Sequence, residues 1–280
     1  MIPIEVRSIY PVRFIVMGGE ISYVRQLVIA EFQSDLTFSM LSSKEKRRLR
    51  RSAEQMEKRT TFEGRGMDLN PFYPKTDSQE DLWTSLNKHT VSIAVGPAGV
   101  GKTLVALWWG LSAVKAGAIQ KIIYVRSDVG CAYQRGRGAL PGTLEEKMAP
   151  LVGPVMDNLA VMCKSHGAAE YLTSKGIIES MMLEDVRGRS FNETLIIFDE
   201  AQNTTPEQIK TVLSRVGQDS KIIVTGDTRQ IDLDAFRTNN GLIDCYHRLS
   251  NLNTVGRVQF TKSDIVRNGV IADILAAYDD

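Results

Sequence analysis

The sequence is poor in cysteine and contains no long hydrophobic segment. Its 280 residues include three cysteines, Cys131, Cys163 and Cys245. An odd number of widely separated cysteines argues against a disulfide framework and against the usual zinc-ligand spacings, and it favours a reducing compartment. The longest apolar run, Leu104–Val114, is much shorter than the ~20 residues that a transmembrane helix needs. We therefore expect no membrane partner.

The start of the sequence shows no signal-peptide pattern, and the net charge is small. Residues Met1–Glu5 contain no basic region followed by an apolar block, which is the pattern of a signal peptide. The net charge of +1 argues against a histone-like polycation, and 43% hydrophobic residues are enough to bury a sizeable core. We expect a soluble, cytoplasmic protein with one large domain and an appendage.

The charge is nevertheless concentrated in one segment. Residues 44–59 contain eight basic and three acidic residues. Ser42 and Glu45 form a capping box, and no glycine or proline interrupts the segment, so a helix over 42–59 is predicted. Its apolar positions are too sparse for a core-facing stripe. It is either a solvated helix between two domains or a contact surface for nucleic acid or a protein partner.

Two regions flank this helix. Short β-rich stretches precede it at Tyr10–Met17 and Tyr23–Phe32, and the segment Thr60–Pro74 contains the glycines and prolines of a linker. We expect a small N-terminal α+β extension over residues 1–67 and a second domain over residues 68–280.

The second domain alternates between strand and helix patterns, and this alternation predicts an α/β fold with a mostly parallel sheet covered by helices on both faces. The expected strands are Val91–Val95, Lys121–Val125, Thr194–Phe198, Lys221–Thr225 and Arg257–Phe260. The expected helices are Glu80–Asn87, Lys102–Lys115, a capped helix from Thr205 to Gly217, and Asp264–Tyr278.

A complete phosphate-binding motif lies between the first strand and the second helix. It consists of Gly96, Pro97, Ala98, Gly99, Val100, Gly101, Lys102 and Thr103, and the nucleotide-binding segment extends to Leu104. Its glycines let backbone N–H groups surround phosphate oxygens, and the helix N-terminus adds partial positive charge. Lys102 is expected to contact the β- and γ-phosphates of ATP, and the Thr103 hydroxyl to ligate Mg²⁺.

Two carboxylates end a second apolar strand. Leu195–Phe198 is followed by Asp199 and Glu200. Asp199 is expected to complete the Mg²⁺ shell, and Glu200 to polarise the attacking water. A solvated turn is the alternative, but the upstream phosphate-binding motif argues against it.

A third strand end carries polar residues that suit a sensor of the γ-phosphate. Thr225 ends the strand that begins at Lys221, and Asp227 and Gln230 follow it. We expect this strand to lie beside the one that ends in Asp199. Gln202 and Gln230 can orient water or relay the phosphate state to bound nucleic acid. The sequence from Asp199 to Gln202, followed by Gly226, Asp227 and Gln230, resembles helicase motifs II and III of superfamily 1.

A narrower resemblance extends over Asn70–Tyr278. The segments that carry it are Arg187–Arg189, Asp199–Gln208, Leu213–Gly217, Ser220–Lys221, Thr225–Asp227, Asp264–Arg267 and Ala277–Tyr278. Together they resemble the PhoH family of cytoplasmic ATPases. The resemblance implies a single RecA-like P-loop core close to that of superfamily 1 helicases, with ATP and Mg²⁺ as cofactors. Some family members, notably those fused to a nuclease domain, are associated with RNA unwinding.

The chain departs from the family after the strand that ends at Val125. Arg126 is kept, but acidic residues of the family give way to Arg135 and Arg137 in a glycine-rich stretch. This stretch corresponds to the helicase region that touches the nucleic-acid backbone. Arg126, Arg135 and Arg137 are therefore candidate nucleic-acid contacts, and a solvated loop is the alternative.

A candidate base-binding segment precedes the phosphate-binding motif. Tyr73–Gln79 resembles a Q-motif, in which Gln79 would hydrogen-bond the adenine edge and Tyr73 would pack on the ring. The alternative for Gln79 is a surface glutamine before an ordinary helix.

Arginines are important for phosphoryl transfer, because an arginine finger that stabilises the charge of the transition state raises the rate by on the order of 10³–10⁵. Arg267 is the first candidate and Arg215 the second; Arg187, Arg189 and Arg229 also lie in segments that match the family. The chain has room for one RecA-like unit. We therefore expect a homo-oligomeric ring, with a hexamer as a candidate form and a finger supplied in trans.

Two functions of different classes remain open. The first is an ATPase that couples hydrolysis to binding or unwinding of RNA or single-stranded nucleic acid, with RNA helicase as its candidate activity. The second is a nucleotide-dependent switch that binds a protein partner through residues 1–67. Glu200 favours the first, because a pure switch does not need a second carboxylate. A small-molecule kinase is disfavoured, since no lid or substrate pocket is recognisable.

Overall fold

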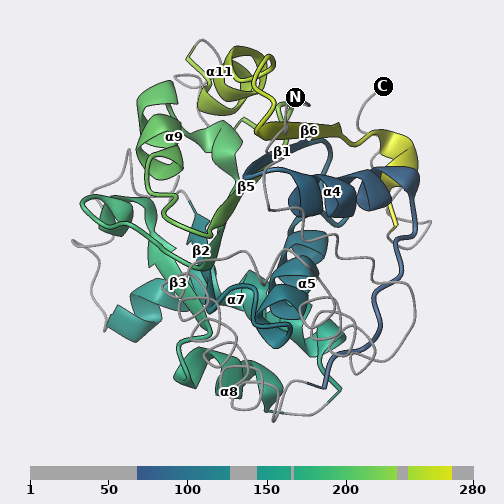
Figure 1. The fold of residues 1–280 in the computed structure, drawn as a ribbon, viewed down its shortest axis with the longest axis vertical. Coiled ribbons are helices and arrows are strands. Elements are labelled where there is room, and N and C mark those ends of the chain that lie inside the picture. Colours follow the sequence, from purple (N-terminus) through teal and green to yellow (C-terminus); the bar gives the residue numbers. More distant parts are fainter. Residues whose placement is uncertain (1–67, 127–143, 165–166, 232–238, 267–280) are drawn as a thin grey trace, which may run out of the picture. The chain divides into compact units, whose positions relative to one another are not determined.

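The computed structural model describes residues 68–126, 144–164, 167–231 and 239–266 (Figure 1). The predicted N-terminal extension over residues 1–67, with its basic helix over 42–59, lies outside these ranges. So do the candidate residues Arg135, Arg137 and Arg267.

Six parallel strands form one sheet in the order β3-β2-β4-β5-β1-β6. Their carboxyl ends therefore share one edge. The strands are β1 (Val91–Val95), β2 (Lys121–Arg126), β3 (Ile178–Met182), β4 (Thr194–Asp199), β5 (Lys221–Gly226) and β6 (Val255–Gln259).

Helices cover both faces of this sheet (Figure 1). Neighbouring residues of one strand enter different cores: Ile197 packs in one hydrophobic cluster and Ile196 in the other, because successive side chains of a strand point to opposite faces. The first cluster includes α4 (Asp77–Lys88), α5 (Lys102–Lys115), α7 (Leu144–Met162) and α8 (Ala168–Ser174). The second includes η2 (Leu183–Val186), α9 (Pro206–Leu213) and α11 (Gly241–Arg248). The fold is an α/β core with a parallel sheet covered on both faces, as the alternation of patterns predicts, and it agrees with the RecA-like core that the resemblance to the PhoH family implies.

Helix α5 approaches the sheet closely at Gly110. A Cβ at this position would lie 2.7 Å from a side-chain carbon of Ile122 and 2.8 Å from one of Leu195. A larger residue would require the fully buried side chains of Ile122 and Leu195, or the helix itself, to move. This close approach fixes the N-terminus of α5 relative to the carboxylates that end β4.

The turns that precede α4, α9 and α11 carry side-chain caps. Thr76 accepts a hydrogen bond from the Gln79 N–H at the start of α4. Thr205 and Gln208 form a capping box on α9, with Pro206 as the first helical residue. Asn240 accepts from the Ile243 N–H and caps α11. These caps fix where each helix leaves the carboxyl edge of the sheet.

Three predicted helix boundaries are wrong. Helix α4 begins at Asp77, three residues before the expected Glu80. Helix α9 ends at Leu213 and does not reach Gly217, and the Arg215 side chain donates to the Thr211 carbonyl just past the helix end. The last helix does not begin at Asp264, because that residue ends the short 3₁₀-helix η4 (Lys262–Asp264) and Ile265 is extended. The predicted strand Arg257–Phe260 is shifted, since β6 spans Val255–Gln259.

The end of the predicted linker packs against the domain. Residue Leu69 forms an isolated bridge with Cys163, and Asn70 donates to the carbonyl of Met162 through its backbone N–H. The Phe72 ring stacks on Trp83 with centroids 5.0 Å apart and also contacts Trp108. Residues 68–74 therefore form part of the domain and one wall of the cavity described below.

Candidate active site

The phosphate-binding loop connects β1 to α5 at the carboxyl edge of the sheet. Gly101 has φ +89°, and a Cβ there would lie 2.9 Å from Nε2 of Gln79, so both backbone conformation and space require glycine. The Lys102 ammonium group donates to the carbonyls of Gly96 at 2.7 Å and Pro97 at 2.8 Å. The loop and the N-terminus of α5 thus form a preorganised anion site.

The electrostatic surroundings of Lys102 favour an anionic ligand. Burial lowers its pKa below the ordinary value of 10.5, while the negative charges of Asp199, Asp227 and Glu200 act in the opposite direction. The nearby carboxylates thus replace only part of the hydration that the ammonium group loses on burial. A phosphate oxygen beside it would supply this compensation.

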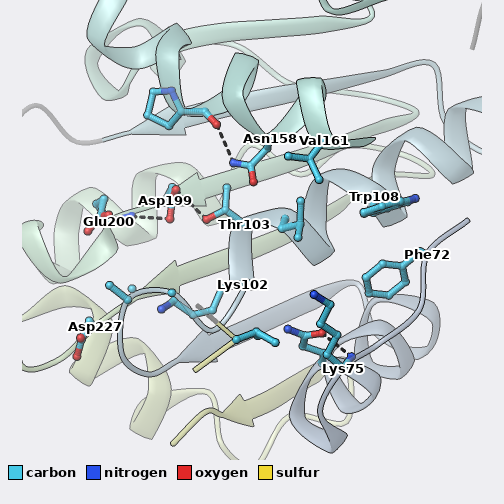
Figure 2. A pocket seen from close by; sticks show the side chains of 18 of the residues that line it. Phe72, Lys75, Lys102, Thr103, Trp108, Asn158, Val161, Asp199, Glu200 and Asp227 are labelled. Carbon is cyan, nitrogen blue, oxygen red and sulfur yellow. Dashed lines mark hydrogen bonds between the residues drawn. The ribbon is translucent and has the colours of Figure 1, made fainter. Parts of the chain in front are cut away.

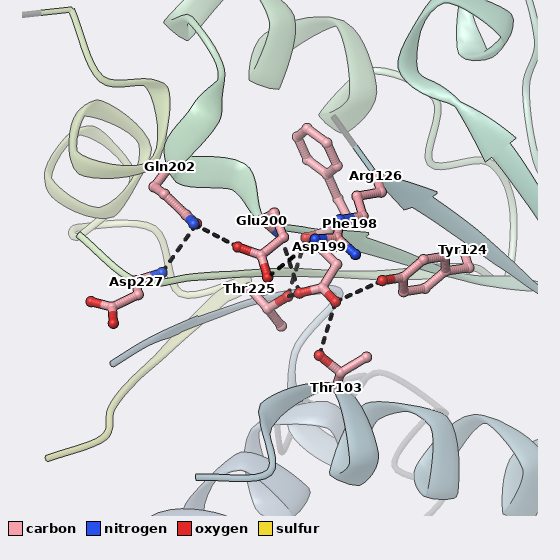
Figure 3. Close-up of polar contacts among 9 residues, drawn as sticks. All are labelled: Thr103, Tyr124, Arg126, Phe198, Asp199, Glu200, Gln202, Thr225 and Asp227. Atoms are coloured by element: carbon pink, nitrogen blue, oxygen red, sulfur yellow. Dashed lines mark hydrogen bonds and ion pairs between the residues drawn. The ribbon is translucent and has the colours of Figure 1, made fainter. Parts of the chain in front are cut away.

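Asp199 accepts hydrogen bonds from four groups (Figure 3). Its Oδ2 accepts from the Thr103 hydroxyl at 3.0 Å and the Tyr124 hydroxyl at 2.8 Å. Its Oδ1 accepts from the Thr225 hydroxyl and from the Glu200 N–H at 3.1 Å. The carboxylate is 8% exposed, so these contacts hold it in one orientation at the end of β4.

The donor set fits a hard divalent cation. Because Thr103 donates its proton to Asp199, the lone pairs of its oxygen are directed away from that carboxylate and are available as metal ligands. Oxygen ligands from a hydroxyl and a carboxylate suit Mg²⁺, which keeps several waters and usually binds few protein groups. Within the described ranges no group of three or more His, Cys, Asp or Glu residues is arranged to hold a metal. Mg²⁺ in such sites is commonly held by one or two protein groups together with substrate phosphates.

Glu200 adopts a left-handed backbone conformation with φ 55°. Its side chain is held on two sides. Oε2 accepts from Nε2 of Gln202 at 2.6 Å, and Oε1 lies 3.8 Å from a guanidinium nitrogen of Arg126. The strained turn directs this carboxylate differently from Asp199, so the two adjacent acids occupy distinct positions (Figure 3).

Gln202 links the ends of β4 and β5. Its Oε1 accepts from the Asp227 N–H at 3.1 Å, and its backbone carbonyl accepts from Asn240 at the head of α11. Gln202 is 1% exposed and Asp227 is 6% exposed. A buried polar path therefore joins Glu200 to the segment after β5, where the sequence places the γ-phosphate sensor.

A cavity of about 680 Å³ surrounds these groups (Figure 2). Of the residues predicted to bind or process nucleotide, it is lined by Tyr73, Gln79, Ala98, Gly99, Gly101, Lys102, Thr103, Leu104, Asp199, Glu200 and Gln230. Arg126, predicted as a nucleic-acid contact, lines the same cavity. The structure therefore brings together residues that lie far apart in the sequence.

The two predicted base-binding residues differ in their surroundings. Tyr73 is 74% exposed and lies at the cavity wall beside Phe72. Gln79 is buried, and both ends of its amide contact the backbone: Nε2 donates to the Val100 carbonyl, and Oε1 accepts from the Lys75 N–H. Gln79 thus holds the phosphate-binding loop to the head of α4. Its contact with adenine stays a prediction.

Arg215 lies at the opposite edge of the sheet. Its carbonyl accepts from the Phe191 N–H just before β4, so the length of β4, about 16 Å for five steps, separates it from Asp199. It cannot serve the site of its own chain, and its predicted role requires a second copy. The other candidate, Arg267, directly follows Val266 in the sequence. The Val266 N–H donates to the Gly99 carbonyl of the phosphate-binding loop at 3.4 Å.

Tyr124 is the one direct partner of Asp199 that the sequence did not single out. It is fully buried in β2, and burial together with the negative charge of Asp199 raises the pKa of its hydroxyl well above its usual range. In sequence it reads as one more apolar strand residue. The available signal was a single hydroxyl-bearing aromatic residue within Ile122–Val125.

Fold and site together define a P-loop nucleotide-binding protein. The family model described as PhoH-like protein matches residues 71–279. The chain belongs to the PhoH-like protein family.

Curated relatives agree with this assignment. The chain is 38% identical to a PhoH-like protein of Bacillus subtilis over 73% of its length, and 32% identical to the protein PhoH of Escherichia coli over 75%. It spans 63% and 59% of these two relatives, respectively. Among solved structures, a Walker-type ATPase of Pyrococcus abyssi is 15% identical, with a TM-score of 0.25 and coverage of 68% of this chain and 54% of that one. No helix in the described ranges is long and apolar enough to cross a membrane.

Proposed function

We propose that this protein hydrolyses ATP and couples hydrolysis to the binding or unwinding of RNA or single-stranded nucleic acid as an oligomer. The observation that carries the first part is the hydrogen bond between Thr103 and Asp199, with Glu200 beside it. This contact joins the phosphate-binding loop to the carboxylate strand. It is the arrangement that phosphoryl transfer to water requires.

The residues take distinct roles in this proposal. Lys102 and the loop N–H groups bind the β- and γ-phosphates, while Glu200 accepts the proton of the attacking water. Thr103 and Asp199 would hold Mg²⁺, which when bound neutralises charge on the phosphate oxygens. Gln202 orients Glu200 through the 2.6 Å hydrogen bond and connects it to Asp227.

The test is ATP hydrolysis by wild type, Lys102→Ala and Glu200→Gln. We expect Glu200→Gln to lower kcat by about 10²–10⁴ while ATP binding remains, because it removes general-base catalysis alone. Lys102→Ala should lose both binding and turnover. Full activity in both variants would overturn the assignment of this site.

The coupling to nucleic acid rests on sequence features outside the described residues, the basic segment 42–59 and the arginines at 135 and 137. Hydrolysis should rise when RNA or single-stranded DNA is added, and binding should weaken steeply with salt, since phosphate contacts release counterions. Running both polymers side by side identifies the preferred one. If nucleic acid neither stimulates ATP hydrolysis nor binds in a salt-sensitive way, the function is instead that of a nucleotide-dependent switch acting on a protein partner.

The oligomeric part has its own test. With Arg215 on the edge opposite the site, its action as a finger requires a neighbouring copy. Turnover per chain should therefore rise with protein concentration through the range in which the oligomer assembles. A turnover that stays flat through that range would exclude a finger in trans.

A further inference from the structure

The predicted contact with nucleic acid does not account for the position of Arg126, which lies within the candidate active site. It is the last residue of β2, and it pairs in register with Asp199 at the end of β4. Its side chain therefore leaves the sheet at the catalytic edge. It lines the same cavity as Lys102, Glu200 and Asp227.

The contact between Arg126 and Glu200 is a loose one. A guanidinium nitrogen lies 3.8 Å from Oε1 of Glu200, which is a charge contact and not a short forked hydrogen bond. The two side chains are 32% and 35% exposed, and ion pairs with this exposure hold their partners weakly. The other oxygen of Glu200 is bound by Gln202 at 2.6 Å. Figure 3 shows Arg126 and Gln202 on opposite sides of the carboxylate.

We propose that Arg126 is a catalytic arginine of this chain's own site, which exchanges Glu200 for the terminal phosphate of a bound triphosphate. The proposal rests on the ATP hydrolysis proposed above. A terminal phosphate carries more negative charge than one carboxylate, and the planar guanidinium matches its oxygens in a fork. Lys102 contacts the phosphates from the loop after β1, and Arg126 contacts them from the end of β2.

The exchange couples phosphate binding to activation of the base. Once the guanidinium leaves Glu200, Oε1 is available for the attacking water. The water oxygen forms a bond to the γ-phosphorus, and the bond from that phosphorus to the bridging oxygen breaks with its electron pair going to ADP. The proton of the water passes to Glu200, and Arg126 stabilises the charge on the transferred group.

The primary test compares Arg126→Ala, Arg126→Lys and the control Arg248→Ala, which removes an exposed arginine paired with Asp244 on α11. Arg126→Ala should lower kcat by about 10³ or more, as loss of an arginine finger does, with ADP affinity unchanged. It should also lose the ability to trap ADP with aluminium fluoride. Arg126→Lys should recover little, because a point charge lacks the fork. Thermal unfolding confirms that each variant is folded.

A double-variant cycle separates a catalytic contact from mere positioning of Glu200. If Arg126 touches the phosphate, Arg126→Ala should abolish aluminium fluoride trapping in a Glu200→Gln background as well as in wild type. If Arg126 acts only by holding Glu200, Arg126→Ala should not reduce trapping any further in the Glu200→Gln background, and the proposal would be wrong. Loss of RNA binding together with unchanged RNA-free hydrolysis would instead assign Arg126 to the nucleic-acid surface.

A binding measurement keeps this inference separate from the proposed function. Wild type should bind a non-hydrolysable ATP analogue more tightly than ADP, and Arg126→Ala should reduce that preference. If wild type does not hydrolyse ATP but the preference still depends on Arg126, hydrolysis fails while the phosphate contact stands. If wild type hydrolyses ATP and Arg126→Ala is indistinguishable from it, the inference alone is overturned.

Discussion

The two edges of the sheet bury polar side chains for different purposes. At the carboxyl edge, the Asp199 carboxylate accepts from three side-chain hydroxyls, those of Thr103, Tyr124 and Thr225. At the amino edge, side chains bond mainly to backbone: the Ser220 hydroxyl accepts from the Thr194 N–H and donates to the Phe191 carbonyl. Asp199 and Ser220 are both buried. Burial of a polar group therefore does not by itself distinguish function from structure.

The difference has a physical origin. Buried backbone groups at the amino edge need hydrogen-bond partners where the chain enters a strand. A serine hydroxyl there supplies the partner that the strand ladder does not. For the carboxylate of Asp199, a fixed orientation matters more than the number of its hydrogen-bond partners, because an oriented carboxylate can hold a cation. Substitutions at the carboxyl edge should thus change activity, and those at the amino edge should change stability.

The largest expected effect in this comparison is that of Tyr124→Phe. Removing the hydroxyl leaves Asp199 with three donors and a freer orientation, as when a group supporting a metal ligand is lost. ATP turnover at limiting Mg²⁺ should fall by about 10–100-fold, and the Mg²⁺ concentration for half-maximal activity should rise. Titration of Mg²⁺ against turnover measures both. An unchanged Mg²⁺ requirement would assign Tyr124 to packing alone.

Ser220→Ala should give the opposite pattern at an intermediate size. It leaves the buried N–H of Thr194 without its partner, which costs about 1–3 kcal/mol of the free energy of unfolding. Turnover and Mg²⁺ requirement should match wild type, because Ser220 lies at the far end of the strands. Urea unfolding beside the activity assay checks this. A selective loss of turnover in a fully stable variant would contradict the division between edges.

The smallest effect concerns Lys221 at the amino edge. Burial lowers the pKa of its ammonium group to about 8 from 10.5, although the group donates to the carbonyls of Asn87 and His89. Between those two pH values the unfolded chain holds a proton that the folded chain has lost, so stability contributed by this residue rises with pH. Below about pH 8 both states are protonated and the contribution is constant.

Lys221→Met removes this titration, together with the ammonium group that lies 5.7 Å from the centroid of the Trp109 ring, and keeps an unbranched side chain. The stability of wild type relative to the variant should therefore improve from neutral pH to about pH 10. Urea unfolding at both pH values gives the difference, and the titration of all other groups cancels. A difference that does not change with pH would show that Lys221 titrates normally.

Much of the catalytic edge follows from sequence, because its groups come from motifs with fixed spacing. The strand Val91–Val95 and the helix Lys102–Lys115 have the predicted bounds. The pairing of the Asp199 strand with the strand from Lys221 is also confirmed. Such motifs are local: the loop, the helix start and the strand end lie within a few residues of one another.

The remainder depends on contacts between distant segments. Tyr124 and Asp199 are 75 residues apart, and only the register of β2 against β4 brings them together. The strand Ile178–Met182 was not predicted, because Glu179 and Ser180 interrupt its apolar pattern at the sheet edge. The placement of Arg126 beside Glu200 follows from the same register. Sequence pattern names the residue types, and strand order decides which of them meet.

The two hydrogen bonds from Lys102 to the carbonyls of Gly96 and Pro97 have a consequence for ligand choice. Any phosphate that enters the loop competes with the loop's own oxygen atoms for the ammonium group. A neutral nucleoside gains nothing from that competition, whereas a multiply charged polyphosphate gains more than the carbonyls lose. The ammonium group of Lys102 therefore exchanges these carbonyls only for a ligand that carries enough negative charge.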